Sequence, residues 1–594
     1  MKQTVSFLLI GLLIVSALGS VPTGAESDNL TLETTMSFTP VSIEYRDDFA
    51  FVSLAESEVS THSEGSPSIP IATNTFVLPF GSTIQDVDVS YSDASVTHLE
   101  SKVAPARGPM YISSDYAQDN CYEYVCDDDV YTHSALYPTQ EISWNLGAGL
   151  QDGEEVMYLS VSTYPVRYNP VSDELVCFEH VEIEVCYEEP EEQITFADDY
   201  DLLILTPEQF SSELQRLVDF KADNGIATLM TNLEDIPNEG ADIQESIKLY
   251  IKDTKESFGI DYVLLVGAGY MEEGAEPIFP VRMAWVGSGS YEDYFPSDLY
   301  YADLYDSELG FSSWDYDGDG KYAELNQDED AIDMYPDVYI SRLPCMTTSD
   351  VKFVVNKIIK YATTNVMNNK ILQIGGDTFP TDGEGVLEGE FTNIAVMDGL
   401  TGYEPIRAWA SDGSLTKLNI VLSVIQGVDF FDFSGHGSPT SFATHAPQDE
   451  HQWLPESLLI PYDTFLYVNV FPMLNLKKIP VVVLNACSCN KFTESQTCMG
   501  WTFVRHPIGG GIAAFGASGI GYGTPGSGEP TRLFGWFEVD LFDQLDEGQD
   551  LGTVWGESLS GYINEFSSEI DGGDLKTIYE MTLIGDCSLL IADA

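Results

Sequence analysis

The chain has 594 residues, too many for one hydrophobic core, so we expect two or three domains. Hydrophobic residues make up 44% and aromatic residues 12% of it, which argues against a disordered protein. Its 25 Lys and Arg against 96 Asp and Glu give a formal charge of −71, which disfavours nucleic acid and anionic membrane surfaces as partners. The acidic residues are spread along the whole chain. A solvated surface suited to high salt explains them best, and cation binding and attraction of basic substrates are the alternatives.

A short apolar segment opens the chain. One lysine precedes an apolar run over residues 7–18, and small residues follow, which is the pattern of a secretory signal peptide over residues 1–26. The run is shorter than a membrane-spanning helix needs, and no later segment approaches that length. We therefore expect a secreted or cell-surface protein whose mature chain has no stable membrane span.

Residues 27–196 differ in pattern from the rest. Short alternating runs such as "DVDVSYSD" and "VEIEVCYE" are separated by proline and glycine, and helical periodicity is nearly absent. This pattern predicts a β-rich domain. It ends in the acidic stretch "CYEEPEEQITFADD", which suits an exposed linker.

Nine cysteines in an exported protein allow disulfides but leave one thiol over. Two pairs lie close in sequence and are candidates for local bridges: Cys121 with Cys126, and Cys177 with Cys186.

From residue 197 onwards, apolar strand-like segments alternate with amphipathic helices. Strands are expected at 202–205, 226–230, 262–266, 371–374, 430–433, 481–484 and 511–515. Helices are clearest after Thr206, the expected N-cap, and over residues 349–362. The alternation predicts an α/β fold with a mostly parallel sheet that carries helices on both faces.

Two of these strands end in residues suited to chemistry. The segment "DFFDFSGHGSP" places His436 between two glycines, and "VVVLNACSCN" places Cys487 just beyond its strand. Because ligands bind beyond the carboxyl ends of parallel strands, a thiol and an imidazole there suggest a nucleophile with its base. The alternatives are a small buried cysteine, a redox pair with Cys489, a Cys489–Cys498 bridge and a structural histidine.

These two segments resemble the His-Gly and Ala-Cys blocks of the gingipain family of caspase-fold cysteine peptidases. Further blocks, among them "YDLLILTPEQF", "PDVYISRLPCMTTSDVKFVVNKIIKY" and "TLIGDCSL", resemble family blocks in family order over residues 200–590. The stretch "GSPSIPIATNTFVLPFG" resembles the β-rich pro-region of such enzymes. The resemblance implies a caspase-like sheet in two halves, 197–364 and 365–594, behind a pro-domain over 27–196. The immunoglobulin-like and adhesin modules of the bacterial gingipains are not expected.

The resemblance also implies a function: a cysteine endopeptidase, made as a zymogen, that acts on proteins or peptides through an acyl-enzyme and needs no cofactor for catalysis. Cys487 would be the nucleophile, His436 the general base, and Asp377 the acid that orients the histidine, unless Asp377 only caps the next turn. The backbone N–H groups of Gly437 and Cys487 would face the oxyanion. Glu388, eleven residues after Asp377, would favour Arg or Lys before the scissile bond, unless it is merely solvated.

One further motif points to a metal. "WDYDGDGKY" places Asp315, Asp317 and Asp319 at alternate positions before a glycine, like the first half of a Ca²⁺-binding loop. Asn326 stands where the closing glutamate would be, so Glu324 or Asp328 would have to replace it. The alternatives are a solvated acidic turn for the motif and, for the whole chain, a non-catalytic caspase-fold surface protein that acts as a Ca²⁺-dependent binding module.

Overall fold

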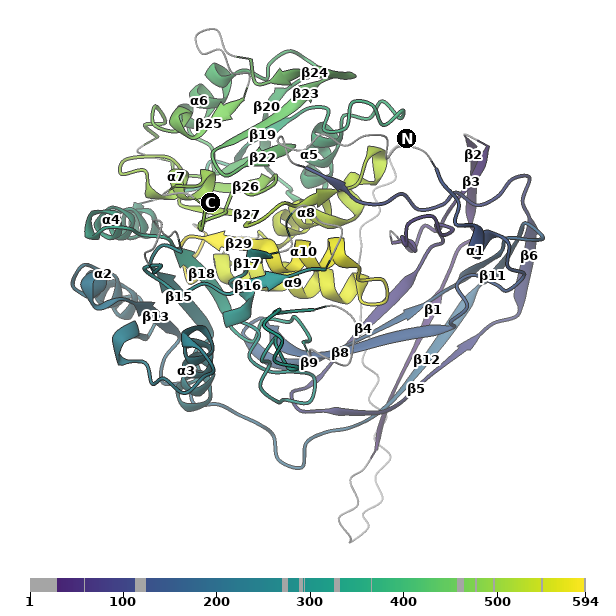
Figure 1. Cartoon of the computed structure of the whole chain (residues 1–594), viewed down its shortest axis with the longest axis horizontal. Helices are drawn as coiled ribbons and strands as arrows, with labels where there is room; N and C mark the ends of the chain where they lie inside the picture. Colours follow the sequence, from purple (N-terminus) through teal and green to yellow (C-terminus); the bar gives the residue numbers. More distant parts are fainter. Residues whose placement is uncertain are drawn as a thin grey trace.

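The computed structural model describes residues 29–46, 48–57, 59–112, 124–269, 276–287, 292, 294–324, 332–364, 366–456, 464–475, 478–494, 497–545 and 548–591. The expected signal peptide lies outside the described residues. A β-rich N-terminal region packs against a larger α/β domain (Figure 1).

The N-terminal region consists of small antiparallel sheets, as the alternating pattern predicts. Along one strand Val181, Ile183 and Val185 are buried while Glu182 and Glu184 are exposed, so a single face meets the core. The sheets are β1(Leu30–Ser37)–β12(His180–Glu188)–β5(Thr83–Tyr91), β4(Ala72–Pro79)–β9(Glu154–Thr163)–β8(Ile142–Gln151), β10(Val166–Asn169)–β11(Glu174–Phe178)–β6(Ala94–His98) and β2(Ser42–Arg46)–β3(Phe49–Ser53).

The α/β domain is built on a ten-stranded sheet. All neighbouring strands are parallel except β27 and β29, and β29 joins the two halves by lying between β18 and β27. This confirms the predicted fold class. In order, the strands are β14(Thr228–Asn232), β13(Leu202–Thr206), β15(Tyr262–Val266), β18(Tyr339–Leu343), β29(Met581–Ile584), β27(Ala513–Ala517), β26(Val481–Asn485), β21(Phe430–Ser434), β19(Lys370–Gly375) and β20(Glu404–Trp409).

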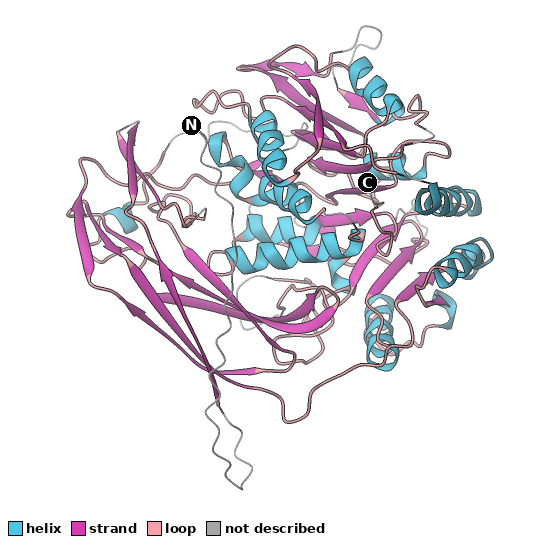
Figure 2. Ribbon diagram, turned by 180° about the vertical axis from the view of Figure 1, so that it is seen from behind, coloured by secondary structure: helices cyan, strands magenta, loops and turns pink. Residues whose placement is uncertain are grey.

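Helices lie on both sides of this sheet (Figure 2). The first buries Phe210, Leu214 and Leu217 along one stripe, as its periodicity predicts. Its N-cap is Pro207 rather than the expected Thr206, because Thr206 still belongs to β13. The helices of the domain are α2(Glu208–Asp223), α3(Ile243–Phe258), α4(Thr348–Thr364), α5(Glu388–Gly399), α6(Lys417–Gln426), α7(Met499–Arg505), α8(Leu533–Gln544), α9(Leu551–Phe566) and α10(Gly572–Glu580).

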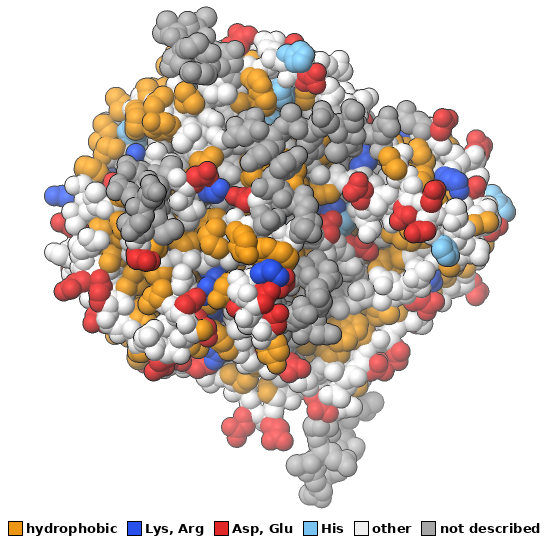
Figure 3. Space-filling model, in the orientation of Figure 1, with side chains coloured by type: hydrophobic (Ala, Val, Ile, Leu, Met, Phe, Trp, Pro, Cys, Tyr) orange, Lys and Arg blue, Asp and Glu red, His pale blue; other side chains and the backbone are white. Residues whose placement is uncertain are grey.

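The surface is acidic over a wide area. Figure 3 shows Asp and Glu side chains scattered over the face drawn, rather than gathered in one patch. Within the described residues, none of the helices combines the length and apolar character that a membrane span needs.

In the described part of the chain the cysteine thiols are free. Cys177 lies on β11 and Cys186 on β12, which belong to different sheets, so the expected bridge between them is wrong. Cys489 and Cys498 are likewise unbridged. Cys121 lies outside the described residues.

The N-terminal region is fixed to the α/β domain by buried polar contacts as well as by packing. The hydroxyl of Ser160 on β9 donates to the side-chain oxygen of Asn564 on α9 at 2.8 Å. The Lys255 ammonium on α3 lies 2.7 Å from the carboxylate of Glu155. These contacts hold the two parts in one orientation.

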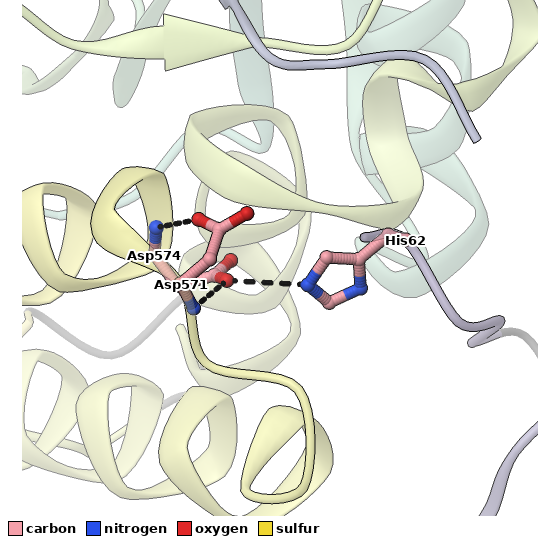
Figure 4. A group of neighbouring side chains, drawn as sticks. All are labelled: His62, Asp571 and Asp574. Atoms are coloured by element: carbon pink, nitrogen blue, oxygen red, sulfur yellow. Dashed lines mark hydrogen bonds and ion pairs between the residues drawn. The ribbon is translucent and has the colours of Figure 1, made fainter. Parts of the chain in front are cut away.

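A buried ionic cluster adds to this interface. Figure 4 shows the His62 ring pointing at the carboxylates of Asp571 and Asp574, which lie at the start of α10, and its Nε2 is 3.3 Å from Asp574. The Arg532 guanidinium lies 3.0 Å from Asp571 and 2.6 Å from Asp574. It holds the pKa of Asp574 well below the usual range despite burial. Because the Arg532 cation pairs with both carboxylates, the cluster is an ion-pair network and gives no reason to invoke a metal.

A second buried ion pair stabilises the sheet itself. Arg342 on β18 binds Asp298 through two hydrogen bonds of 2.7 and 2.6 Å, and the two side chains are 0% and 5% exposed. Removing one partner would leave an uncompensated charge in the core.

We therefore predict that Asp298→Ala lowers the free energy of unfolding by about 3–5 kcal/mol. The matched control is Glu404→Ala, which breaks the exposed pair with Lys370 at 3.5 Å and should cost less than about 1 kcal/mol. Thermal melts of both variants and the parent protein test this. Equal melting temperatures for the two variants would contradict it.

Candidate active site

The candidate site lies where two neighbouring strands of the central sheet end. Strands β21 and β26 are parallel partners, and their last residues, Ser434 and Asn485, are in register. Two residues further along, His436 begins β22(His436–Ser438) and Cys487 follows β26. The sheet therefore brings the two predicted residues to one edge, as parallel pairing requires.

A sharp turn follows the thiol. Ser488 has a φ of +55°, a conformation that costs a non-glycine residue about 1–2 kcal/mol, and its N–H donates to Gly519 O at 2.6 Å. The turn separates the neighbouring thiols. The Cys487 thiol is 3.2 Å from Gly521 O, whereas the Cys489 thiol lies 3.8 Å from Ser438 O.

One contact sets the tautomer of His436. Its Nε2 lies 2.7 Å from the carbonyl oxygen of Thr378, which can only accept, so Nε2 carries the proton. Nδ1 then carries a lone pair, and it has no hydrogen-bond partner among the residues that the structure describes. Burial lowers the pKa of His436 to about 4, against the opposing effect of the Thr378 carbonyl, so the ring is neutral at pH 7.

Aromatic rings enclose this histidine. The Phe379 and Trp453 rings have centroids 6.0 and 5.4 Å from that of His436, and the Trp453 ring also lies against His445, with centroids 3.8 Å apart and a tilt of 38°. Trp453 belongs to β24(Asp449–Leu454), which pairs with β23(Ser441–Ala446). These strands come from the stretch between the two motifs, and they wall the histidine side of the site.

Among the described residues, no hydrogen bond joins the Asp377 carboxylate to His436. One of its carboxylate oxygens accepts the N–H of Gln448 at 2.7 Å, and the other has no hydrogen-bond partner within the described chain. Its backbone pairs with that of His445, so the side chain points towards the turn at Gln448. In this structure the carbonyl of the next residue, Thr378, makes the contact with the histidine that was expected of Asp377, and an orienting role for Asp377 stays a prediction.

Two backbone amides converge on a single oxygen. The N–H groups of Gly437 and Cys487 point at the carbonyl oxygen of Ile112, at 3.1 and 3.4 Å. A Cβ on Gly437 would come within 2.4 Å of Cys487 O, so only glycine fits there. Two converging N–H groups beside a thiol are the arrangement that stabilises an oxyanion. Their catalytic role stays a prediction.

Ile112 belongs to the N-terminal region, which lays a short strand across the site. Strand β7(Met110–Tyr111) pairs antiparallel with β28(Tyr522–Gly523), and the N–H of Ile112 donates to Gly521 O at 3.2 Å. Nothing in the sequence indicated this contact, because "ARGPMYI" carries no motif and the strand is too short for a recognisable alternation.

Burial favours the neutral forms of both candidate catalytic side chains. Cys487 is 0% exposed, and burial raises the pKa of its thiol well above the usual value. With His436 also neutral, the pair is a thiol and an imidazole rather than an ion pair. A nucleophile in this state is poorly reactive.

Glu388 supports the loop that carries the histidine partner. It is 0% exposed at the start of α5, and its carboxylate accepts N–H groups from Thr378 at 3.0 Å, Phe379 at 3.1 Å and Gly526 at 2.9 Å. Burial raises its pKa to about 8. The alternative of a solvated glutamate is thus wrong. The role in substrate binding stays a prediction.

The acidic motif forms a compact turn. Each of Asp315, Asp317 and Asp319 has a carboxylate oxygen within 4.8 Å of the others. The Lys321 ammonium is 2.8 Å from Asp319 and 3.3 Å from Glu324. Asn326 and Asp328 lie outside the described residues, so the closing half of the loop is not tested.

The chain matches Peptidase family C25 over residues 196–592 and the Propeptide_C25 family over residues 28–207. Gingipain R1 of Porphyromonas gingivalis is 21% identical over 584 residues, covering 90% of this chain and 50% of the relative. Gingipain R2 of the same species is 21% identical over 406 residues, with coverages of 66% and 46%. The chain thus spans about half the length of these curated relatives.

Among solved structures, the complex of Porphyromonas gingivalis RgpB pro- and mature domains matches with a TM-score of 0.46 and 20% identity, covering 66% of this chain and 79% of that one. A structure that addresses the zymogenic latency of gingipain K from Porphyromonas gingivalis matches with a TM-score of 0.22 and 20% identity, covering 27% of this chain and 86% of that one. The family matches span almost all of the described residues and confirm the resemblance found in the sequence. The chain belongs to Peptidase family C25 and carries the propeptide of that family.

Proposed function

We propose that the protein is an exported cysteine endopeptidase that cleaves through an acyl-enzyme. His436 Nδ1 takes the proton of the Cys487 thiol, and the thiolate attacks the substrate carbonyl carbon. The Gly437 and Cys487 amides stabilise the oxyanion, and the protonated His436 then gives its proton to the leaving amine. Water, deprotonated by His436, releases the acyl group. The observation that carries this proposal is the convergence of the two amides on a peptide carbonyl beside Cys487.

The Thr378 carbonyl has a defined part in this scheme. It accepts the Nε2–H of His436, which leaves Nδ1 as the basic nitrogen in the resting state. When Nδ1 is protonated, the same carbonyl stabilises the imidazolium. The backbone therefore supplies the orientation that other cysteine and serine hydrolases obtain from a side chain.

Residues 27–196 would act as an inhibitory pro-domain. Ile112 covers the nucleophile, and the exposed stretch over residues 189–199 is the accessible place to cut the chain between the two parts. Cutting there would allow the β-rich region to leave, which exposes Cys487 to solvent.

A preference for Arg or Lys before the scissile bond is what the resemblance implies, with Glu388 as the recognising acid. The contacts of Glu388 give this preference little support. Its carboxylate already accepts three backbone N–H groups, and its raised pKa favours the neutral form.

The first prediction concerns the two neighbouring thiols. Cys487→Ala should lower peptide hydrolysis by at least about 10⁴-fold, because it removes the attacking atom. The matched control Cys489→Ala should change the rate by less than about threefold, since its thiol faces the Ser438 carbonyl. Turnover of a casein substrate measures both. Activity in Cys487→Ala together with an inactive Cys489→Ala would contradict the assignment.

The second prediction concerns latency. In full-length protein, iodoacetamide should label Cys487 at least about a hundredfold more slowly than in active protein, because the thiol is buried and neutral. Mass spectrometry should find that the active fraction has been cut near residues 189–199. An active fraction that contains only uncut chain would refute this role for the pro-domain.

We also propose that Asp315, Asp317 and Asp319 hold a structural Ca²⁺. Chelation at fixed ionic strength should then lower the melting temperature, because three neighbouring carboxylates would repel one another. Asp317→Asn should remove the response to chelator. An unchanged melt of the parent protein in chelator would exclude the site.

A further inference from the structure

The segment that covers the thiol lies in the cleft like a substrate. It runs antiparallel to β28, the N–H of Ile112 donates to Gly521 O at 3.2 Å, and the carbonyl of Ile112 accepts the Gly437 and Cys487 amides. A peptide bound for cleavage presents the carbonyl before the scissile bond to such a pair of amides. Ile112 therefore occupies the position of the residue whose carbonyl would be attacked. The side chains of Ile112 and of the residues before it therefore indicate which substrate side chains the cleft can hold.

The site for the residue before the scissile bond holds an aliphatic side chain. Ile112 is 1% exposed, and a Cβ on Gly523 would come within 2.9 Å of its Cγ2, so glycine makes the room. Two buried acids lie near this site, and both are bound to donors of the chain. Glu529 accepts the Thr524 N–H at 2.6 Å, and Glu388 accepts three N–H groups. Burial raises the pKa of both carboxyl groups, and both oxygens of Glu388 already accept backbone N–H groups.

The preceding residue of the segment is aromatic and meets an aromatic partner. The rings of Tyr111 and Tyr522 have centroids 4.6 Å apart at 32°, and their hydroxyls are 3.1 Å apart. A ring pair in this geometry contributes about 0.5–1.5 kcal/mol beyond its buried area.

A basic side chain of the covering segment is bound several residues before Ile112. Arg107 lies five residues before Ile112, and its Nη2 is 2.7 Å from the Glu384 carboxylate and 3.1 Å from Pro525 O. The two charged side chains are only 12% and 15% exposed, so the pair is largely withdrawn from water. The segment thus places its arginine away from the attacked carbonyl.

Building on the proposed function, we infer that the cleft selects peptides by three side chains. It takes a branched aliphatic residue directly before the scissile bond and an aromatic residue one position earlier. It also takes a basic residue five positions before the aliphatic one, and Glu384 binds this basic side chain. This differs from the Arg or Lys before the bond that the resemblance implies.

Substitution of Ile112 in the full-length protein tests the inferred preference before the scissile bond directly. We compare Ile112→Arg, Ile112→Asp and Ile112→Val by the rate at which iodoacetamide labels Cys487, read by mass spectrometry. Ile112→Arg and Ile112→Asp should each speed labelling by about tenfold or more, because a charged side chain must enter a buried site, and Ile112→Val should stay within about threefold. Slower labelling in Ile112→Arg than in the parent protein would show that the site binds a basic side chain, and it would overturn the inference. Equal rates in all variants would also overturn it.

Two controls keep the result interpretable. Cys345 and Cys587 are 0% exposed, so labelling of these thiols identifies a variant that has unfolded. The charge pair is tested with Arg107→Glu and Glu384→Arg. Each alone should speed labelling of Cys487, and the double variant should restore a rate within about threefold of the parent. Failure of the double variant to recover would exclude Glu384 as the recognising group.

Peptides complete the test with the active fraction, in which the chain has been cut near residues 189–199. A peptide carrying the sequence RGPMYI before a reporter should be hydrolysed at least about tenfold faster than the same peptide ending in Arg. The reverse order would overturn the inferred specificity and leave the peptidase function intact. Labelling needs only a reactive thiol, so its outcome does not depend on peptidase activity. Loss of the function itself would instead appear as hydrolysis that persists in Cys487→Ala.

Discussion

The carbonyl oxygen of Ile112 is the point at which the two parts of the molecule depend on each other. It accepts the amides of Gly437, in β22 just beyond β21, and of Cys487, just beyond β26, so it can be bound by both only when the sheet holds the ends of β21 and β26 side by side. It also belongs to the N-terminal region, whose position is fixed at a distance by the contacts of Ser160 with α9 and of His62 with α10. Blocking of the site therefore depends on the whole interface and not on one strand.

Burial has different effects on the acids and on the candidate catalytic pair. Asp574 keeps its charge because Arg532 lies against it, whereas Glu388 binds only backbone N–H groups and has a raised pKa. Cys487 and His436 have no counter-charge in contact, so burial makes both neutral. Exposure to water would favour the charged forms of this pair. Departure of the covering segment would then alter the chemistry of the site as well as access to it.

Much of the fold could be predicted because short stretches of sequence show the apolar patterns of strands and helices. The strand expected at 262–266 matches β15, and those at 430–433 and 481–484 match β21 and β26 to within one residue. β29 was not predicted, because its pairing with β18 and β27 is a long-range contact with no local signature. The same holds within the site. A motif could predict His436 and Cys487, but the histidine contact of Thr378 uses a backbone carbonyl, which every residue has.

That carbonyl has a consequence for a chain with a formal charge of −71. A carboxylate in its place would add one more negative charge to a chain that is already strongly negative. Its influence on the pKa of His436 would also change with its own protonation and with the surrounding counter-ions. A peptide dipole has no proton to lose, and it is fixed by the hydrogen bonds that Glu388 makes to the neighbouring backbone. The basicity of the His436 imidazole should therefore depend less on salt and on pH than it would beside a carboxylate.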